Sequence, residues 1–101
     1  IAVKKDAKEN VVMRAVITVV GKDAVGILAK VSGRCSDHSV NVIEVTQSIL
    51  QDVFAMIMMV DISRCDIPFT QLVDEMTALG NENGLVIHCM HSDIFDAMHT
   101  I

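Results

Sequence analysis

Aromatic residues are scarce in this sequence, which has three phenylalanines and no tryptophan or tyrosine among its 101 residues. Proteins that hold single-stranded nucleic acid rely on exposed rings on which the bases stack. Basic residues are scarce as well: between Cys35 and Ile101, Arg64 is the only one, against ten acidic residues. A chain with a formal net charge of −5 also repels phosphate backbones. We therefore expect no nucleic-acid partner.

Long apolar runs are missing too. The longest uninterrupted apolar stretch is Val53–Val60, eight residues, whereas a membrane-spanning helix needs about 20. The three cysteines, Cys35, Cys65 and Cys89, are widely spaced and odd in number, which is not typical of a disulfide framework. We expect a cytoplasmic protein with reduced thiols and no membrane partner.

The composition is that of one globular domain, with 51% hydrophobic and 21% charged residues. Residues 1–12 differ from the rest because they carry three lysines and show no clear period. Met13 then opens a strongly apolar segment. We predict an N-terminal extension over 1–12, native or added, and a single domain over 13–101.

The first half of the domain predicts strand, helix, strand. β-branched residues indicate a strand over 14–20 that Gly21 ends, and Asp23 stands where a helix N-cap is expected. The helix that follows has an apolar face at helical spacing, made of Ile27, Leu28, Val31 and Cys35. Residues 40–50 alternate as a strand does, with one mostly apolar face made of Ile43, Val45, Gln47 and Ile49.

The second half predicts strand, helix, strand and a short final helix. A tight turn at Gln51 and Asp52 leads into a strand over 53–60 that is apolar on both faces. Pro68 fits the first turn of the next helix, and Gly80 is expected just after its end. The apolar face of that helix consists of Phe69, Leu72, Val73, Met76 and Leu79. A last strand over 85–90 is followed by a helix from Ser92.

The order βαββαβ with right-handed crossovers predicts an α+β, ferredoxin-like sandwich: a four-stranded antiparallel sheet with two helices on one face, plus the short C-terminal helix. Two helices cover only one side of such a sheet. A strand that is apolar on both faces, as 53–60 is, is normally buried on both. We expect the C-terminal helix to cover part of the second face and a second copy of the chain to cover the rest, as a homodimer.

The turn from the first strand to the first helix is the first candidate binding site. Free amides at a helix N-terminus favour an anion such as a carboxylate, and Gly26 lets a ligand approach the backbone closely. A plain capped helix with a flexible start is the alternative interpretation. Asn41 is the second candidate, since its amide can bind both ends of a zwitterion if the crossover brings it near this turn. The alternative for Asn41 is a turn residue that satisfies its own backbone.

Metal binding and catalysis have weaker support. The last strand carries two histidines and a cysteine in residues 88–91, but a zinc site needs three or four ligands and no second cluster is in view. Cys35, Ser36 and His38 are neighbours in sequence at a helix end, which does not make a catalytic triad. We predict no metal site, no cofactor, no catalytic residues and no enzymatic activity.

The segment from Ala15 to Leu28, AVITVVGKDAVGIL, resembles the opening of an ACT domain, in which a strand is followed by Gly, Asp-x-x-Gly-Ile and a helix. Asn41-Val42 resembles the Asn-Ile pair that begins the second strand of that family. From Met13 to Ile101, including the ending IFDAM, the chain is similar to a small, uncharacterised bacterial family of stand-alone ACT-domain proteins. That family is in turn similar to the halves of the glycine cleavage system repressor.

The resemblance implies a regulatory, non-catalytic module that binds a small amino acid at a domain–domain interface. The positions that match the family's ligand contacts are Asp23, Ala24, Val25, Gly26 and Ile27, together with Asn41. The chain departs from the pattern at Ser39, where the family often has glycine. We therefore expect a homodimer that senses an amino acid and modulates an unidentified protein partner. The alternative is a protein-interaction or dimerisation module without a small-molecule ligand.

Overall fold

The computed structural model describes residues 13–22 and 26–98, and the predicted extension over 1–12 lies outside them. Strands and helices follow one another in this order: β1 (Arg14–Gly21), α2 (Ile27–Asp37), β2 (Asn41–Leu50), β3 (Val53–Asp61), α3 (Phe69–Glu82), β4 (Val86–His91) and α4 (Ser92–Met98). This order agrees with the one expected from the periodicity of the sequence.

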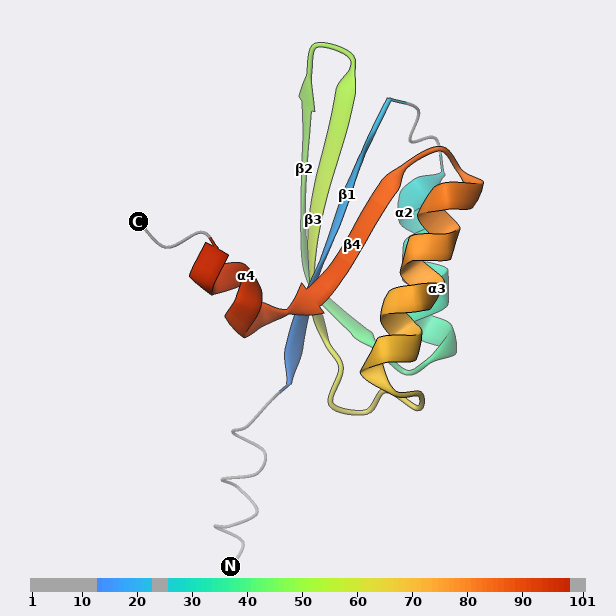
Figure 1. The fold of residues 1–101 in the computed structure, drawn as a ribbon, viewed down its shortest axis with the longest axis vertical. Coiled ribbons are helices and arrows are strands. Elements are labelled where there is room, and N and C mark those ends of the chain that lie inside the picture. Colours follow the sequence, from blue (N-terminus) through green and yellow to red (C-terminus); the bar gives the residue numbers. More distant parts are fainter. Residues whose placement is uncertain (1–12, 23–25, 99–101) are drawn as a thin grey trace, which may run out of the picture.

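The strands form one antiparallel sheet in the order β2-β3-β1-β4. The central strand β1 pairs with β3 and with β4, while β2 pairs with β3 alone among the described strands. Both crossover helices, α2 and α3, pack on the same face of the sheet (Figure 1), as right-handed crossovers require. The ferredoxin-like α+β fold predicted from the sequence is confirmed.

The core lies between the sheet and these two helices. Side chains alternate along β1, so every second residue faces the helices, and these residues are fully buried: Ala15, Ile17 and Val19. Helical spacing brings the buried residues of α2 onto one face: Ile27, Val31 and Cys35. The buried apolar side chains of α3 are Leu72, Met76 and Leu79. Leu28, which was predicted to share the buried face of α2, is exposed.

The prediction for the faces of β2 is wrong at the start of the strand. Val42 pairs with Val60 of β3, and Glu44 pairs with Met59, the residue before Val60. Ile43 has no partner in β3 and therefore forms a bulge. A β-bulge adds one residue and shifts the alternation of side chains. As a result Val42, with Val45, packs against the core, whereas Ile43 is 44% exposed.

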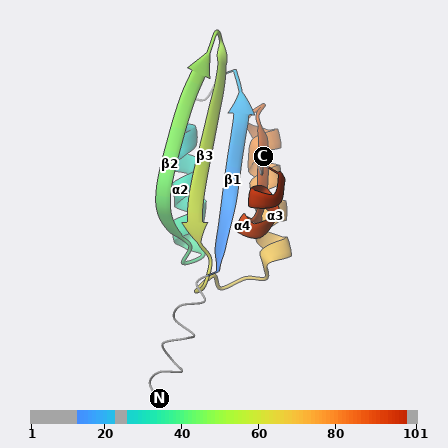
Figure 2. The ribbon, with the colours of Figure 1, turned by 90° about the vertical axis from the view of Figure 1, so that its left-hand side faces the viewer.

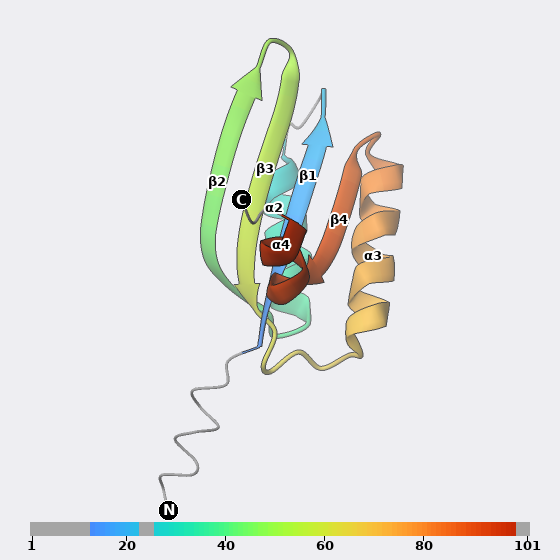
Figure 3. The ribbon, with the colours of Figure 1, turned by 60° about the vertical axis from the view of Figure 1, so that its left-hand side comes forward.

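The opposite face of the sheet is covered only in part. Val16 points away from the helices yet is fully buried, and α4 lies over this part of β1 and β4 (Figure 3). Beyond α4, the side chains of Val20, Ile57 and Val86 are 43%, 42% and 55% exposed. The expectation that the C-terminal helix shelters only part of this face agrees with the structure.

His38, just after α2, joins three segments of the chain. Its Nδ1 lies 2.9 Å from Asp66 Oδ1, and its Nε2 lies 2.8 Å from Glu75 Oε1 on α3. The backbone N–H of Asp66 also donates to the carbonyl of His38 at 3.2 Å. The hydrogen bond to Asp66, then the one to Glu75, raises the pKa of His38, because an imidazolium donates from both nitrogens. The hydrogen bond between His38 and Glu75 also lowers the pKa of Glu75.

Gly80 was expected just after α3 but lies inside it, where the helix comes closest to β4. A Cβ on Gly80 would lie 2.8 Å from the carbonyl oxygen of Leu85 and 2.9 Å from a side-chain carbon of Ile87. The N–H of Leu85 donates to the carbonyl of Gly80 at 2.8 Å. The missing side chain therefore sets the distance between the helix and the sheet, and α3 continues to Glu82 with Asn83 as its C-cap.

We expect His38→Gln to remove a pH-dependent part of the stability. A raised pKa in the folded state stabilises the fold fully below the ordinary value of 6.5, and this contribution disappears as pH rises through the folded value. Urea unfolding at a series of pH values should show that the wild type is favoured over the variant most near pH 6 and least at high pH. Asp66→Asn should shrink the same dependence. Parallel pH profiles for wild type and His38→Gln would contradict the role assigned to this contact.

We expect Gly80→Ala to lower the free energy of unfolding by about 1–3 kcal/mol, because the new methyl group forces α3 away from β4. Gly33→Ala is the matched control, since Gly33 lies in α2 with no heavy atom within 4 Å of its would-be Cβ. That variant should be more stable by up to about 1 kcal/mol, because alanine is the better helix former. Thermal unfolding of both variants measures the difference, and a Gly80→Ala protein as stable as the wild type would disprove the close contact.

Candidate functional site

The two parts of the predicted binding site lie at opposite ends of α2. Asn41 lies in the same row of paired residues as Arg14, at the beginning of β1. Gly21 lies at the opposite end of β1. From there the chain leads to Gly26, so the 11 residues of α2 separate Gly26 from Asn41. A helix of that length spans roughly 16 Å. The expected proximity of Asn41 to the turn is therefore wrong within one chain, since a single small amino acid cannot contact both ends.

The start of α2 offers backbone groups and no capping side chain. Gly26, not Asp23, occupies the N-cap position, with φ 73° and ψ 3°, and its carbonyl accepts from the N–H of Lys30 at 3.1 Å. Ile27 is buried in the core, so only its backbone is available to a ligand. Asp23 and the next two predicted contacts, Ala24 and Val25, lie outside the described residues.

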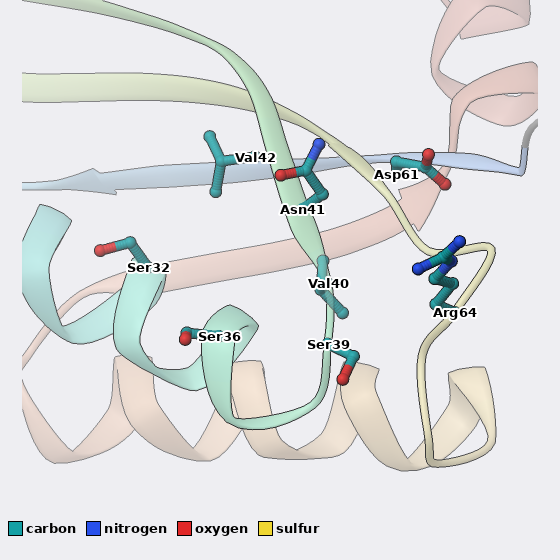
Figure 4. Close-up of a pocket in the computed structure, with 8 residues that line it drawn as sticks. All are labelled: Ser32, Ser36, Ser39, Val40, Asn41, Val42, Asp61 and Arg64. Atoms are coloured by element: carbon teal, nitrogen blue, oxygen red, sulfur yellow. The ribbon is translucent and has the colours of Figure 1, made fainter.

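Asn41 lines an open pocket between the end of α2, the start of β2 and the loop after β3 (Figure 4). Its volume is about 770 Å³, within the roughly 300–1,000 Å³ that small-molecule sites occupy. Hydroxyl, amide and charged side chains make up most of its wall. The lining residues are Ser32, Ser36, Ser39, Val40, Asn41, Val42, Asp61 and Arg64.

A strained turn brings Asn41 to this pocket. Ser39 has φ 61°, the left-handed conformation for which glycine is best suited, at the position where the resemblance often gives glycine. The N–H of Val40 donates to the carbonyl of Cys35 at 2.8 Å, which ends α2 and turns the chain into β2. Residues held in sparsely populated backbone conformations cluster at functional sites. The turn therefore fixes Asn41 as the first residue of β2, with its side chain exposed.

The pocket carries one negative and one positive side chain. Hydrogen bonds from the hydroxyl and the backbone N–H of Ser63, the latter at 2.8 Å, hold the pKa of Asp61 below its ordinary range. The positive charges of Arg14 and Arg64 act in the same direction, so Asp61 is ionised at neutral pH. Arg64 itself is exposed at the rim. Neither pocket charge was predicted from the sequence, although the isolation of Arg64 among acidic residues was a visible sign.

Two features of the structure argue against a nucleophilic thiolate at Cys35 or Cys89 and against a triad. Burial raises the pKa of the Cys35 thiol to about 11 and that of Cys89 to about 12, so both thiols stay protonated and unreactive. His38 is engaged on both ring nitrogens by carboxylates of the β3–α3 loop and of α3. It is therefore unavailable as a base for Ser36.

Metal-ligating side chains do not gather at one point. Across residues 13–22 and 26–98, no three histidine, cysteine or acidic side chains are placed to hold a metal ion. His91, one of the two histidines of β4, stacks on Phe69 with the ring centroids 4.1 Å apart. None of the helices in the described part of the chain has the length and apolar character of a membrane span.

Comparison with known proteins identifies the family. Residues 13–90 match the family model of the ACT domain. A UPF0237 protein of Listeria innocua is 43% identical over 89 residues, which are 88% of this chain and 100% of that protein. The solved structure of an ACT domain protein from Streptococcus pneumoniae is 38% identical, with a TM-score of 0.73, and the match covers 87% of this chain and 99% of that one.

A more distant similarity links the fold to a transcriptional regulator. The structure described as a glycine cleavage system transcriptional repressor matches with a TM-score of 0.66 at 22% identity, over 80% of this chain and 46% of that one. At that identity the match shows the shared fold alone. The family model, the Listeria relative and the Streptococcus structure together carry the assignment: the chain belongs to the ACT domain family.

Proposed function

We propose that this chain is a cytoplasmic, non-catalytic regulatory module that binds a small amino acid at the interface of a homodimer and modulates a protein partner. ACT domains are typically regulatory modules that bind amino acids. The single observation that carries the proposal for this chain is the polar pocket around Asn41. Its amide, hydroxyl and charged groups suit the hydrogen-bonding ends of an amino acid.

The positions of the two parts of the predicted site, the start of α2 and Asn41, support an interface between two copies. Within one chain, α2 separates Gly26 from Asn41. We infer a two-fold axis that is perpendicular to α2 and passes close to its middle, because such an axis brings the helix start of one copy to Asn41 of the partner subunit. Two-fold dimers are the commonest closed assemblies. The exposed valine and isoleucine side chains on the outer face of the sheet lie on the side away from α2, so they mark a separate surface that a partner can cover.

Regulation follows from a ligand that contacts two subunits at once. Such a ligand binds one dimer geometry more tightly than another and so shifts the equilibrium between them. A protein partner that recognises one geometry is then coupled to the ligand by the same free energy. The module acts without catalysis and without a cofactor of its own.

A dimerisation or interaction module without a ligand is the second candidate. The observation that favours it is the open part of the outer face, where Val20, Ile57 and Val86 are exposed. An apolar face can be covered by a protein partner without any small molecule. The two candidate functions are distinguished by adding amino acids, because only the amino-acid-binding module responds to them.

Titration with each standard amino acid, followed by amide NMR, tests the proposal. We expect at least one amino acid at millimolar concentration to shift the amide resonances of Gly26, Ile27 and Asn41. These residues belong to the two parts of the site, so they sense a ligand held between subunits. If none of the amino acids shifts any of these resonances, ligand binding is refuted and the dimerisation module remains.

We expect Gly26→Val to weaken amino-acid binding at least tenfold, because a side chain there blocks the approach of a ligand to the backbone. Gly84→Val is the matched control. Both glycines have positive φ, 73° and 69°, and open space around them, so both variants carry a similar strain of roughly 1–3 kcal/mol. Only the first lies in the proposed site.

Light scattering after gel filtration accompanies this comparison. Wild type and both variants should have a molar mass twice the 11.0 kDa of one chain, since neither substitution removes an apolar side chain. A wild-type mass of one chain at micromolar concentration would exclude the interface, and equal loss of binding in both glycine variants would assign the effect to strain.

A further inference from the structure

The pocket around Asn41 holds opposite charges on one wall. Asp61 ends β3, and Arg64 lies three residues further along the loop that follows (Figure 4). Arg64 is the only basic residue between Cys35 and the C-terminus of an acidic chain. Among the described residues that line the pocket, its guanidinium is the one positive charge. Arg64 is therefore the lining group that attracts the carboxylate of a ligand to this pocket.

The polar groups of the pocket are not satisfied by one another. Among the described residues, the guanidinium of Arg64 and the side chains of Asn41, Ser36 and Ser39 take part in no hydrogen bond or ion pair. The carboxylate of Asp61 accepts from the backbone N–H and the hydroxyl of Ser63, and the charges of Arg14 and Arg64 act on it. The pocket thus presents donors and acceptors that are free to bind a ligand.

Both walls are held in place by contacts outside the pocket. The backbone N–H of Asp66, two residues after Arg64, donates to the carbonyl of His38, the residue before Ser39, at 3.2 Å. The imidazole of His38 also contacts the carboxylate of Asp66 at 2.9 Å. These bonds tie the loop that carries Arg64 to the turn that carries Asn41. A preformed site loses less conformational entropy when it binds.

We propose, on the basis of the amino-acid binding described above, that this pocket in a single chain holds both charged ends of a zwitterionic α-amino acid. The guanidinium of Arg64 receives the carboxylate, the carboxylate of Asp61 receives the ammonium group, and the amide of Asn41 bonds to both. A guanidinium matches a carboxylate with two parallel hydrogen bonds. An asparagine amide supplies one donor group and one acceptor.

This assignment gives the partner subunit a secondary role. The head group of the amino acid is recognised within one chain, and its side chain points out of the open pocket toward the second copy. The start of α2 of the partner subunit then closes over the bound amino acid and does not supply its main charge partner. Arg64 and Asp61 become ligand contacts that the family pattern did not indicate for this chain.

The test uses NMR titration of the full chain with the twenty standard amino acids, together with glycinamide and N-acetylglycine. Glycine consists of little besides its two charged ends, and each derivative lacks one of them. We expect glycine to shift the amide resonances of Asn41 and Arg64. Both derivatives should bind at least about tenfold more weakly, because each loses a charge-assisted hydrogen bond.

Arg64→Gln should weaken the binding of glycine, and of any other amino acid that binds, by about tenfold or more. Arg14→Gln is the matched control: it removes the same charge from a residue that also acts on Asp61 but does not line the pocket. It should change affinity less than twofold. Arg64 is exposed, so the variant is expected to fold, and its amide spectrum verifies this.

The outcomes separate this inference from the proposed function. If amino acids bind and Arg64→Gln binds them as tightly as the wild type, the pocket assignment is overturned and the regulatory role stands. Glycinamide that binds as well as glycine would also overturn the pocket assignment alone. If binding depends on Arg64 in a chain that is a monomer, the pocket stands and the dimer interface falls. If no amino acid binds, both are overturned.

Discussion

A four-stranded sheet has two faces, and the two crossover helices of this chain pack on the same one (Figure 1). The handedness of βαβ crossovers imposes this arrangement. It places the apolar residues of β1, α2 and α3 in one core, and in the part of the chain that the structure describes only α4, seven residues long, packs on the other face. So short a helix shelters Val16 and leaves Val20 and Ile57 open. The exposure of these apolar side chains therefore arises from the topology itself.

The same crossover separates the two ends of α2. A crossover helix between two parallel strands starts near the end of the first strand and finishes near the beginning of the second, so its termini lie at opposite ends of the strands. Figure 2 shows β1 and β2 running in the same direction, with α2 behind them carrying the chain back from the end of one strand to the start of the other. Gly26 and Asn41 are consequently not neighbours within one chain. The left-handed turn at Ser39 and the bonds of His38 instead build a separate polar pocket at the Asn41 end.

Most of the fold could be predicted from the sequence because periodicity reports which side of an element is buried. The alternation in β1 and the helical spacing in α3 indicated the element order and the core residues. The bulge at Ile43 was not predictable in this way, because both neighbours of that residue in the sequence fit a regular strand. Gly80 was interpreted as a helix end because glycine commonly stands there, whereas contact with β4 explains it here.

The candidate site was less predictable than the fold. Asn41 and Gly26 were selected from local chemistry and from the resemblance, and the pocket does include Asn41. Asp61, at the end of β3, and Arg64, in the loop after it, come from about 20 residues further on, and the pairing of β3 with β2 brings them to the pocket. Such a juxtaposition depends on strand register, which a bulge alters and which no local pattern displays.

The bulge in β2 also bears on how a second chain can join the sheet. β2 is a free edge among the described strands, and an exposed edge is a template for pairing with another strand. Ile43 interrupts the regular spacing of N–H and C=O groups near the beginning of this edge. An added strand therefore finds an uninterrupted row of partners only from Glu44 to Leu50. Asn41 lies beyond that row, so its side chain remains open to solvent even in a sheet that continues from one molecule into the next.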